Sequence, residues 1–268
     1  MATTVADPLS LKGVTLADKY LVEGMVAEGG FSFVYRAQHQ VWKQPCVLKF
    51  LKGAEELSET EREKVVAALV QEGVLLRELS SRAAAILQAH DMGTWEAPTG
   101  DSYPYLVLEW LDGCTLRQAI RAAKKASVAP LIMGEAIALF GPVAQALTAT
   151  HRRGVAHRDL KPENLFVCGA FRQPDTYIKV LDFGVAKVLS QTVVRAPGDR
   201  AAQRSQAAFT PWYGAPEQFM QDHGSTGPWT DVFALALIMV ETMTFRRALS
   251  GDDVTGLALS SIHPVERP

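Results

Sequence analysis

Cysteine is scarce in this chain of 268 residues. The three cysteines, Cys46, Cys114 and Cys168, are scattered and form no CxxC pair, which argues against structural zinc and favours a reducing compartment. Neither sign of charge dominates, because 27 Lys and Arg residues stand against 29 Asp and Glu residues. The net charge of −2 therefore gives no indication of a surface for nucleic acid or for an anionic membrane.

Long apolar runs, repeats and targeting signals are also missing. The longest apolar run, residues 232–240, is about half the length that a membrane-spanning helix needs. Residues 1–15 lack the basic start and apolar stretch of a secretory signal. Apolar residues make up 48% of the chain, enough for a core, and 21% charged residues argue against disorder. We therefore expect a cytoplasmic protein with no membrane segment.

The order of elements predicts a strand-rich first part and a helical second part. Glycines at 24, 29 and 30 punctuate the first strands, and Ser58 with Glu61 forms a capping-box pattern before the first helix. Strands are expected at 20–22, 33–35, 47–50, 85–90, 105–108 and 177–181, and helices at 60–79, 116–126, 135–152 and 230–245. Helix 230–245 is apolar nearly all round, which predicts that it is buried, whereas polar residues 190–208 read as a surface loop.

One acid interrupts an apolar stripe. Within the helix expected at 60–79, Glu72 falls on the face formed by Val65, Leu69, Leu76 and Leu79. An acid that faces inward needs a cationic partner to offset the loss of hydration. We therefore expect a lysine or arginine near Glu72.

The run HRDLKPEN at residues 157–164 carries the strongest chemical signal, and DFG follows at residues 182–184. Two acids, an amide and a lysine at these spacings suit phosphoryl transfer, since Asp159 can orient a hydroxyl while Asn164 and Asp182 hold magnesium against a triphosphate. These motifs resemble those of the protein kinase family. The lysine at position 161 resembles the variant of the motif in the serine/threonine branch of this family. The alanine-rich composition is compatible with a bacterial member.

The resemblance covers about residues 20–249 and implies an α+β, bilobal protein-kinase-like fold. A small antiparallel β-sheet N-lobe with one key helix would precede a mainly helical C-lobe. We expect a flexible N-terminal tail at 1–15, the N-lobe and hinge at 16–111, and the C-lobe at 112–268. Residues 249–268 look polar and capless, so the C-lobe is expected to miss its last helices, as a fragment would.

The same resemblance implies an ATP site in the N-lobe and hinge. Lys49 would grip the α and β phosphates and pair with Glu72, although a lysine on an apolar strand also fits an edge or snorkelling position. In the phosphate loop, Ala27 and Ser32 stand where the family has glycine, and small residues still permit close backbone approach. The nucleotide-binding residues would be Ala27, Gly29, Gly30, Ser32, Val34, Val47, Lys49, Leu108, Glu109, Leu111 and Phe166.

Individual roles in that site follow from the family pattern. The Glu109 carbonyl and the Leu111 N–H would bind adenine, and Leu108 would be the gatekeeper. Val34 and Val47 on one side and Phe166 on the other would sandwich the base. Ordinary core packing is the alternative for each of these apolar residues.

The catalytic run would act with magnesium. Asp159 would accept or aim the proton of the substrate hydroxyl, and Lys161 would neutralise charge on the transferring group. Asn164 and Asp182 would bind the metal. We expect His157 to be a structural link between DFG and the catalytic loop.

The activation segment would follow DFG. Thr210 would touch Asp159 and Lys161, and Glu217 is the last residue of an APE motif. Arg158 implies control by phosphate on this segment, with Ser205 as the first candidate and Thr192 as the second, although an unmodified loop serine is as plausible. Two glycine positions of the family carry Phe209 and Ala236, and Asp231 would anchor the backbone of the catalytic loop.

The leading interpretation is an ATP- and Mg²⁺-dependent serine/threonine protein kinase that acts on protein hydroxyls. Its partners would be ATP, a protein substrate and a second copy for trans-autophosphorylation. A pseudokinase scaffold is the alternative, favoured by the departures at Ala27 and Ser32 and by the helices that the C-lobe is expected to miss. It is opposed by the intact polar residues Lys49, Glu72, Asp159, Asn164 and Asp182. A small-molecule phosphotransferase of the aminoglycoside type is disfavoured, because such enzymes lack an APE-like segment and the Asp231 helix.

Overall fold

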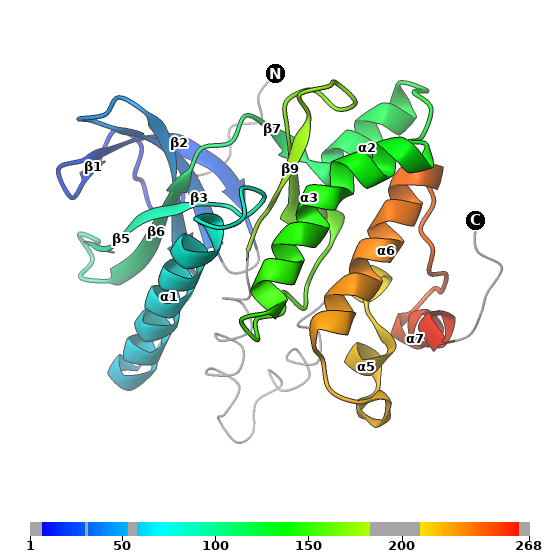
Figure 1. Ribbon diagram of the computed structural model, residues 1–268. Helices are drawn as coiled ribbons and strands as arrows, with labels where there is room; N and C mark the ends of the chain where they lie inside the picture. Colours follow the sequence, from blue (N-terminus) through cyan, green and yellow to red (C-terminus); the bar gives the residue numbers. More distant parts are fainter. Residues whose placement is uncertain (1–6, 30–31, 53–57, 183–209, 263–268) are drawn as a thin grey trace. The chain divides into compact units, whose positions relative to one another are not determined.

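The computed structural model describes residues 7–29, 32–52, 58–182 and 210–262 (Figure 1). The chain divides into two compact units, which are described separately. Of the described residues, the first unit takes those at 7–78 and 87–110, and the second takes those at 79–86, 111–182 and 210–262.

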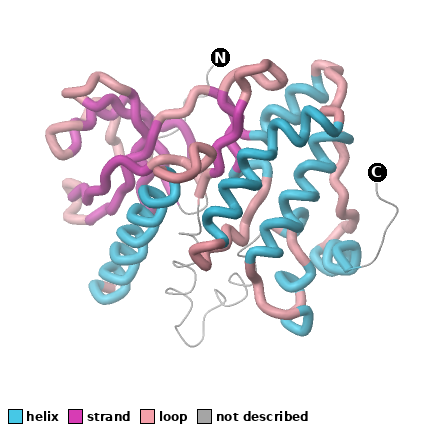
Figure 2. Tube along the Cα trace, viewed as in Figure 1, coloured by secondary structure: helices cyan, strands magenta, loops and turns pink. Residues whose placement is uncertain are grey.

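The first unit is built on a six-stranded sheet with the strand order β1-β2-β3-β4-β6-β5, in which every neighbouring pair is antiparallel. Figure 2 draws the strands in magenta. Each strand predicted in this part lies within an observed one except that at 85–90, because β5 begins only at Ala89. The strands are β1 Thr15–Leu16, β2 Tyr20–Glu28, β3 Ser32–His39, β4 Pro45–Leu51, β5 Ala89–Glu96 and β6 Ser102–Glu109.

Helix α1, Glu59–Ser80, follows β4 and begins where the capping pattern predicted. The Glu61 carboxylate accepts hydrogen bonds from the backbone N–H of Ser58 at 3.0 Å and from its hydroxyl at 2.6 Å. Leu69, Leu76 and Glu72 are all buried. The expectation that Glu72 faces inward is therefore confirmed.

Residues 7–14, the described part of the chain before β1, pack against the core of the first unit, in contrast to the flexible tail expected for residues 1–15. Leu11 is fully buried in the same cluster as Tyr35 and Phe50. The Tyr35 hydroxyl donates to Asp7 Oδ1 at 2.7 Å. Backbone hydrogen bonds of Gly13 and Val14 with Val22 add to these side-chain contacts and hold the segment on the sheet.

The second unit combines a small antiparallel sheet with several helices (Figure 1). Its strands, in the order β7-β8-β9, are Gly113–Thr115, Leu165–Cys168 and Tyr177–Val180. Its helices are α2 Leu116–Lys125, α3 Met133–His151, α5 Pro216–Phe219, α6 Pro228–Thr244 and α7 Val254–Ile262, with short 3₁₀ turns η1 Pro162–Asn164, η4 Pro211–Tyr213 and η5 Gln221–His223.

Two expectations about the end of the chain are wrong. Helix α6 is not buried on all sides, because Trp229 and Val232 are 57% and 61% exposed while Ile238 is fully buried. Residues 250–262 are not simply polar and capless: α7 buries Leu257, and the Asp253 side chain accepts a hydrogen bond from the Gly256 N–H at 2.7 Å. In the described part of the chain, no helix has the length and apolarity to span a membrane.

Candidate active site

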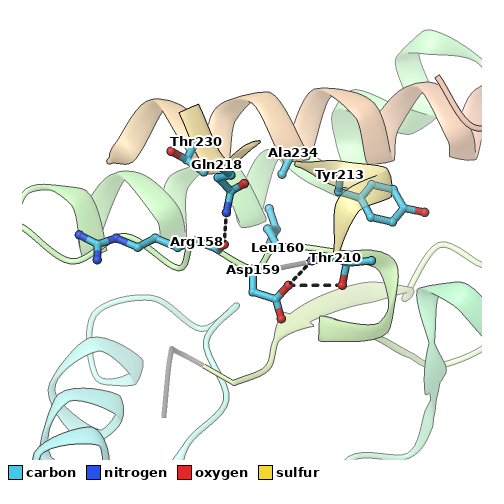
Figure 3. A pocket seen from close by; sticks show the side chains of 8 residues that line it. All are labelled: Arg158, Asp159, Leu160, Thr210, Tyr213, Gln218, Thr230 and Ala234. Atoms are coloured by element: carbon cyan, nitrogen blue, oxygen red, sulfur yellow. Dashed lines mark hydrogen bonds between the residues drawn. The ribbon is translucent and has the colours of Figure 1, made fainter. Parts of the chain in front are cut away.

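The Asp159 carboxylate in the second unit is the centre of the candidate site (Figure 3). Its Oδ1 accepts hydrogen bonds from the backbone N–H of Thr210 at 3.1 Å and from the Thr210 hydroxyl at 3.4 Å. Its Oδ2 accepts from the Lys161 ammonium at 2.9 Å and from Asn164 Nδ2 at 3.4 Å. Every oxygen of this partly exposed acid is thus oriented by at least one neighbour.

The backbone around Asp159 is anchored to α6 by Asp231. This carboxylate is fully buried, and its Oδ1 accepts the Arg158 N–H at 2.7 Å. Its Oδ2 accepts the His157 N–H at 2.8 Å and contacts His151 Nε2 at 2.7 Å. The anchoring role that the family pattern implied for Asp231 is therefore confirmed.

His157 links this loop to the residue before DFG. Its Nε2 lies 2.8 Å from the carbonyl oxygen of Leu181, and its Nδ1 accepts the backbone N–H of Asp159 at 3.3 Å. These two contacts fit the tautomer that carries its proton on Nε2. The structural role expected for His157 is confirmed.

Two non-glycine residues of the site have a left-handed backbone. Arg158 has φ 61° and Asp182 has φ 51°. Such conformations cost free energy, so they persist only where surrounding contacts impose them. The hydrogen bond of Arg158 N–H to Asp231 and that of the Leu181 N–H to the Asn164 carbonyl at 2.8 Å supply such contacts.

Asn164 and Asp182 present donor atoms that fit magnesium. Asn164 Nδ2 donates to the Asp159 carbonyl at 2.8 Å, so the amide oxygen Oδ1 is the atom of this side chain that could take a cation. An amide oxygen and a carboxylate are hard ligands of the kind that Mg²⁺ takes when phosphate oxygens and water complete its shell. In the described residues, no group of three or more His, Cys, Asp or Glu side chains is arranged to hold a metal.

Helix α5 is tied to both the loop that carries Asp159 and helix α6. Gln218 Nε2 on α5 donates to the Arg158 carbonyl at 2.8 Å (Figure 3). Glu217 accepts a hydrogen bond from the Thr230 hydroxyl on α6. A small pocket is lined by Arg158, Asp159, Leu160, Thr210, Tyr213, Gln218, Thr230 and Ala234.

A polar cluster, buried except for Glu163, lies beside this pocket, and we call it the Arg117 cluster: Arg117, Glu163, Tyr213 and Glu241. Arg117 donates to Glu163 Oε1 at 2.8 Å, to Glu241 Oε1 at 2.6 Å and to the Tyr213 hydroxyl. Tyr213 in turn donates to Glu241 Oε2. Burial and the hydrogen bond to Glu241 raise the pKa of Tyr213. Burial lowers the pKa of Arg117, but the two carboxylates raise it by more, so the net shift is upward.

Sequence reasoning missed the Arg117 cluster, although a signal was available. Glu241 interrupts an apolar helix in the same way as Glu72, and it is 5% exposed. The argument that assigned Glu72 a cationic partner applied equally to Glu241. The identity of that partner, Arg117, depends on the packing of α2 and could not be read from spacing.

In the first unit, the candidate phosphate-binding residues lie on neighbouring elements. Lys49 is on β4, where it pairs with Val34 on β3, and Glu72 is buried on α1. Ala27 pairs with Val34, and the Gly29 N–H donates to the Ser32 carbonyl at 2.8 Å, which closes the connection between β2 and β3. The ion pair of Lys49 with Glu72 stays a prediction.

The candidate adenine-binding residues are divided between the two units. Leu108 is buried on β6 opposite Val47, and the Glu109 N–H donates to the Gln88 carbonyl at 3.0 Å. Leu111 and Phe166 belong to the second unit, with Phe166 on β8. Three further predicted residues, Gly30, Thr192 and Ser205, lie outside the described residues.

Comparisons with known proteins bear on this arrangement. The chain matches the protein kinase domain family over residues 20–267. It is 32% identical over 262 residues to the serine/threonine-protein kinase pkn3 of Myxococcus xanthus, which covers 96% of this chain and 43% of that protein.

Two other relatives are similar over most of the chain. Identity is 30% over 249 residues to the probable serine/threonine-protein kinase PknB of Lactococcus lactis, covering 92% of this chain and 35% of that protein. It is 27% over 251 residues to the serine/threonine-protein kinase PknB of Mycobacterium tuberculosis, covering 92% and 36%. The chain spans less than half the length of these relatives. The antiparallel sheet, the helical second unit and the family match together confirm the predicted fold, and this chain belongs to the protein kinase domain family.

Proposed function

We propose that this chain transfers the γ-phosphate of ATP to serine or threonine hydroxyls of protein substrates. The observation that carries the proposal is the Asp159 carboxylate, oriented by Lys161, Asn164 and Thr210. Phosphoryl transfer needs few covalent steps from the protein, so positioning and charge stabilisation supply most of the catalysis. A carboxylate held from several sides suits that task.

Residues of the second unit would each have a separate role in the transfer. Asp159 Oδ1 would accept the hydrogen bond of the substrate hydroxyl, in place of the long contact with the Thr210 hydroxyl at 3.4 Å. The Lys161 ammonium, 2.9 Å from Asp159 Oδ2, would offset charge on the transferring group. Asn164 and Asp182 would hold Mg²⁺, which when bound neutralises the phosphate oxygens.

The residues of the first unit would grip the nucleotide. Lys49 is proposed to bind the α and β phosphates with Glu72 as its partner, and the Gly29–Ser32 connection to approach the phosphates with its backbone N–H groups. Leu108 and the backbone of Glu109 are proposed to take the adenine. Leu111 and Phe166 of the second unit are proposed for the same ligand.

Regulation through the activation segment is part of the proposal. Arg158 would attract a phosphate on this segment, with Ser205 as the first candidate site. Mass spectrometry of active enzyme should find phosphate between residues 190 and 210. Active enzyme without phosphate in that stretch would contradict this form of regulation.

A transfer assay with radiolabelled ATP and a generic protein substrate tests the function. Wild-type chain should transfer label, and Asp159→Asn should reduce kcat by about 10²- to 10⁴-fold, because the amide cannot accept the proton. The matched control is Asp175→Asn, since Asp175 is an exposed acid of the same unit. Nucleotide binding without transfer in the wild-type chain would instead indicate a pseudokinase scaffold.

Metal and phosphate contacts are tested separately. Asp182→Asn should abolish transfer and weaken the Mg²⁺ dependence of nucleotide binding, with an unchanged circular dichroism spectrum. Lys49→Met should weaken ATP binding with or without Mg²⁺. Normal turnover in either variant would show that its residue is misassigned.

A further inference from the structure

The 3₁₀ turn η4 holds two aromatic neighbours in different environments. Tyr213 is 3% exposed and belongs to the Arg117 cluster. Trp212 is only partly buried, and its ring is covered by the Arg247 side chain. The buried neighbour therefore fixes the backbone from which Trp212 projects.

Arg247 is positioned by the end of α6. Phe245 ends this helix in the left-handed conformation, with φ 55°, and its N–H donates to the Glu241 carbonyl at 2.7 Å. The guanidinium carbon of Arg247 then lies 4.1 Å from the centre of the Trp212 ring. Glu241 on the same helix holds Tyr213, so α6 sets both halves of the Trp212–Arg247 contact.

Within the described residues, the charge of Arg247 is not neutralised by an acidic side chain. No described carboxylate forms an ion pair with it, and its guanidinium lies over the face of Trp212. A different cation interacts with the C-terminal end of α6: Lys124 Nζ lies 3.5 Å from the Phe245 carbonyl oxygen. A guanidinium that stacks by its face keeps its edge N–H groups available for a planar anion.

This contact lies beside the candidate phosphoacceptor site. Trp212 follows Thr210 by only two positions, and Thr210 contacts Asp159 directly. We propose that Trp212 and Arg247 form a docking shelf for an acidic side chain of the protein substrate. This inference deepens the proposed function and depends on it for the identity of the ligand.

The shelf favours an acid over other side chains for two reasons. An apolar residue finds the ring of Trp212 already covered by Arg247. A basic residue is repelled by Arg247 and by its exposed neighbour Arg246. A carboxylate gains charge-assisted hydrogen bonds with the guanidinium edge.

Peptide kinetics test the shelf. Each peptide carries one serine, neutral residues and a single Glu, Lys or Ala, placed at successive positions on both sides of the serine. At one position, the wild-type chain should prefer Glu to Ala by about fivefold in kcat/KM, mostly through KM, as an exposed ion pair allows. Arg247→Glu should reverse the order of Glu and Lys at that position, whereas the control Arg246→Glu should keep the wild-type order.

Fluorescence anisotropy of the same labelled peptides separates this inference from the proposed function. If no peptide is phosphorylated, the proposed function fails. The shelf is then tested by the peptide affinities from anisotropy alone. A Glu preference that is lost in Arg247→Glu supports the shelf. A wild-type chain with no Glu preference at any position, or a preference that survives Arg247→Glu, overturns it.

Discussion

Asp231 concentrates several hydrogen bonds on one carboxylate of α6. Its Oδ1 and Oδ2 accept the backbone N–H groups of Arg158 and His157, and Oδ2 also contacts His151. A carboxylate has no donor, so it can satisfy all three groups at once. The residue type is therefore dictated by its partners.

Asp231→Asn should lower the free energy of unfolding by about 2–3 kcal/mol, because the amide NH₂ meets a buried backbone donor and leaves it unsatisfied. Urea unfolding followed by tryptophan fluorescence measures the loss. Asp222→Asn, in the exposed turn η5, should change stability by less than about 0.5 kcal/mol. Equal stability of the Asp231 variant and wild type would contradict the anchoring role.

At the scale of elements, the Arg117 cluster joins α2, α6, η1 and η4. Arg117 and Glu241 are 7% and 5% exposed, whereas the Glu163 side chain is 44% exposed. The buried part thus pairs one cation with one anion, and the second acid keeps contact with solvent. Removal of one buried member leaves its partner charged in the interior.

Arg117→Met should destabilise the chain by about 3–5 kcal/mol, since it strands the Glu241 carboxylate. The double variant Arg117→Met/Glu241→Met should be more stable than the sum of the single effects predicts. Arg121→Met, an exposed change on the same helix, is the control. Additive effects in denaturant unfolding would show that Arg117 and Glu241 do not interact.

The segment before β1 is a second element-scale case. Leu11→Ala should cost about 2–5 kcal/mol, because it leaves a cavity in the core of the first unit. Lys12→Ala, at the next and exposed position, should be close to neutral. A Leu11 variant as stable as wild type in thermal unfolding would restore the expectation of a loose tail.

At the scale of the whole molecule, sequence reasoning predicted the family, the fold class and the local roles of His157 and Asp231, because these depend on motifs and on one buried acid. It failed where tertiary partners decide the outcome. Leu11 is buried by a sheet formed later in the chain, and the exposed face of α6 depends on which helices cover it. Arg117 was missed because its two acids come from distant segments.

High pH should destabilise the molecule. Burial and hydrogen bonds to acids raise the pKa of Tyr20, Tyr35 and Tyr213 above the ordinary value of 10.0. Above pH 10 the folded chain keeps protons that the unfolded chain loses, so the free energy of unfolding falls by about 1.4 kcal/mol per pH unit for each such tyrosine.

Urea titrations between pH 8 and pH 11 measure this slope. Above pH 10, Tyr213→Phe should make the fall in unfolding free energy less steep by the contribution of one tyrosine, whatever its effect on stability at pH 8. An unchanged slope in that variant would mean that Tyr213 ionises equally well in the folded and unfolded chain.

The burial of Asp231 also has a kinetic consequence. The amide protons of His157 and Arg158 are held by a carboxylate that solvent does not reach. In deuterated water these two amides can exchange only when the loop separates from α6, so their exchange rates report the opening of a core helix. The loop that presents Asp159 is thus expected to exchange these amide protons as slowly as the protein interior does, although the Asp159 side chain is partly exposed.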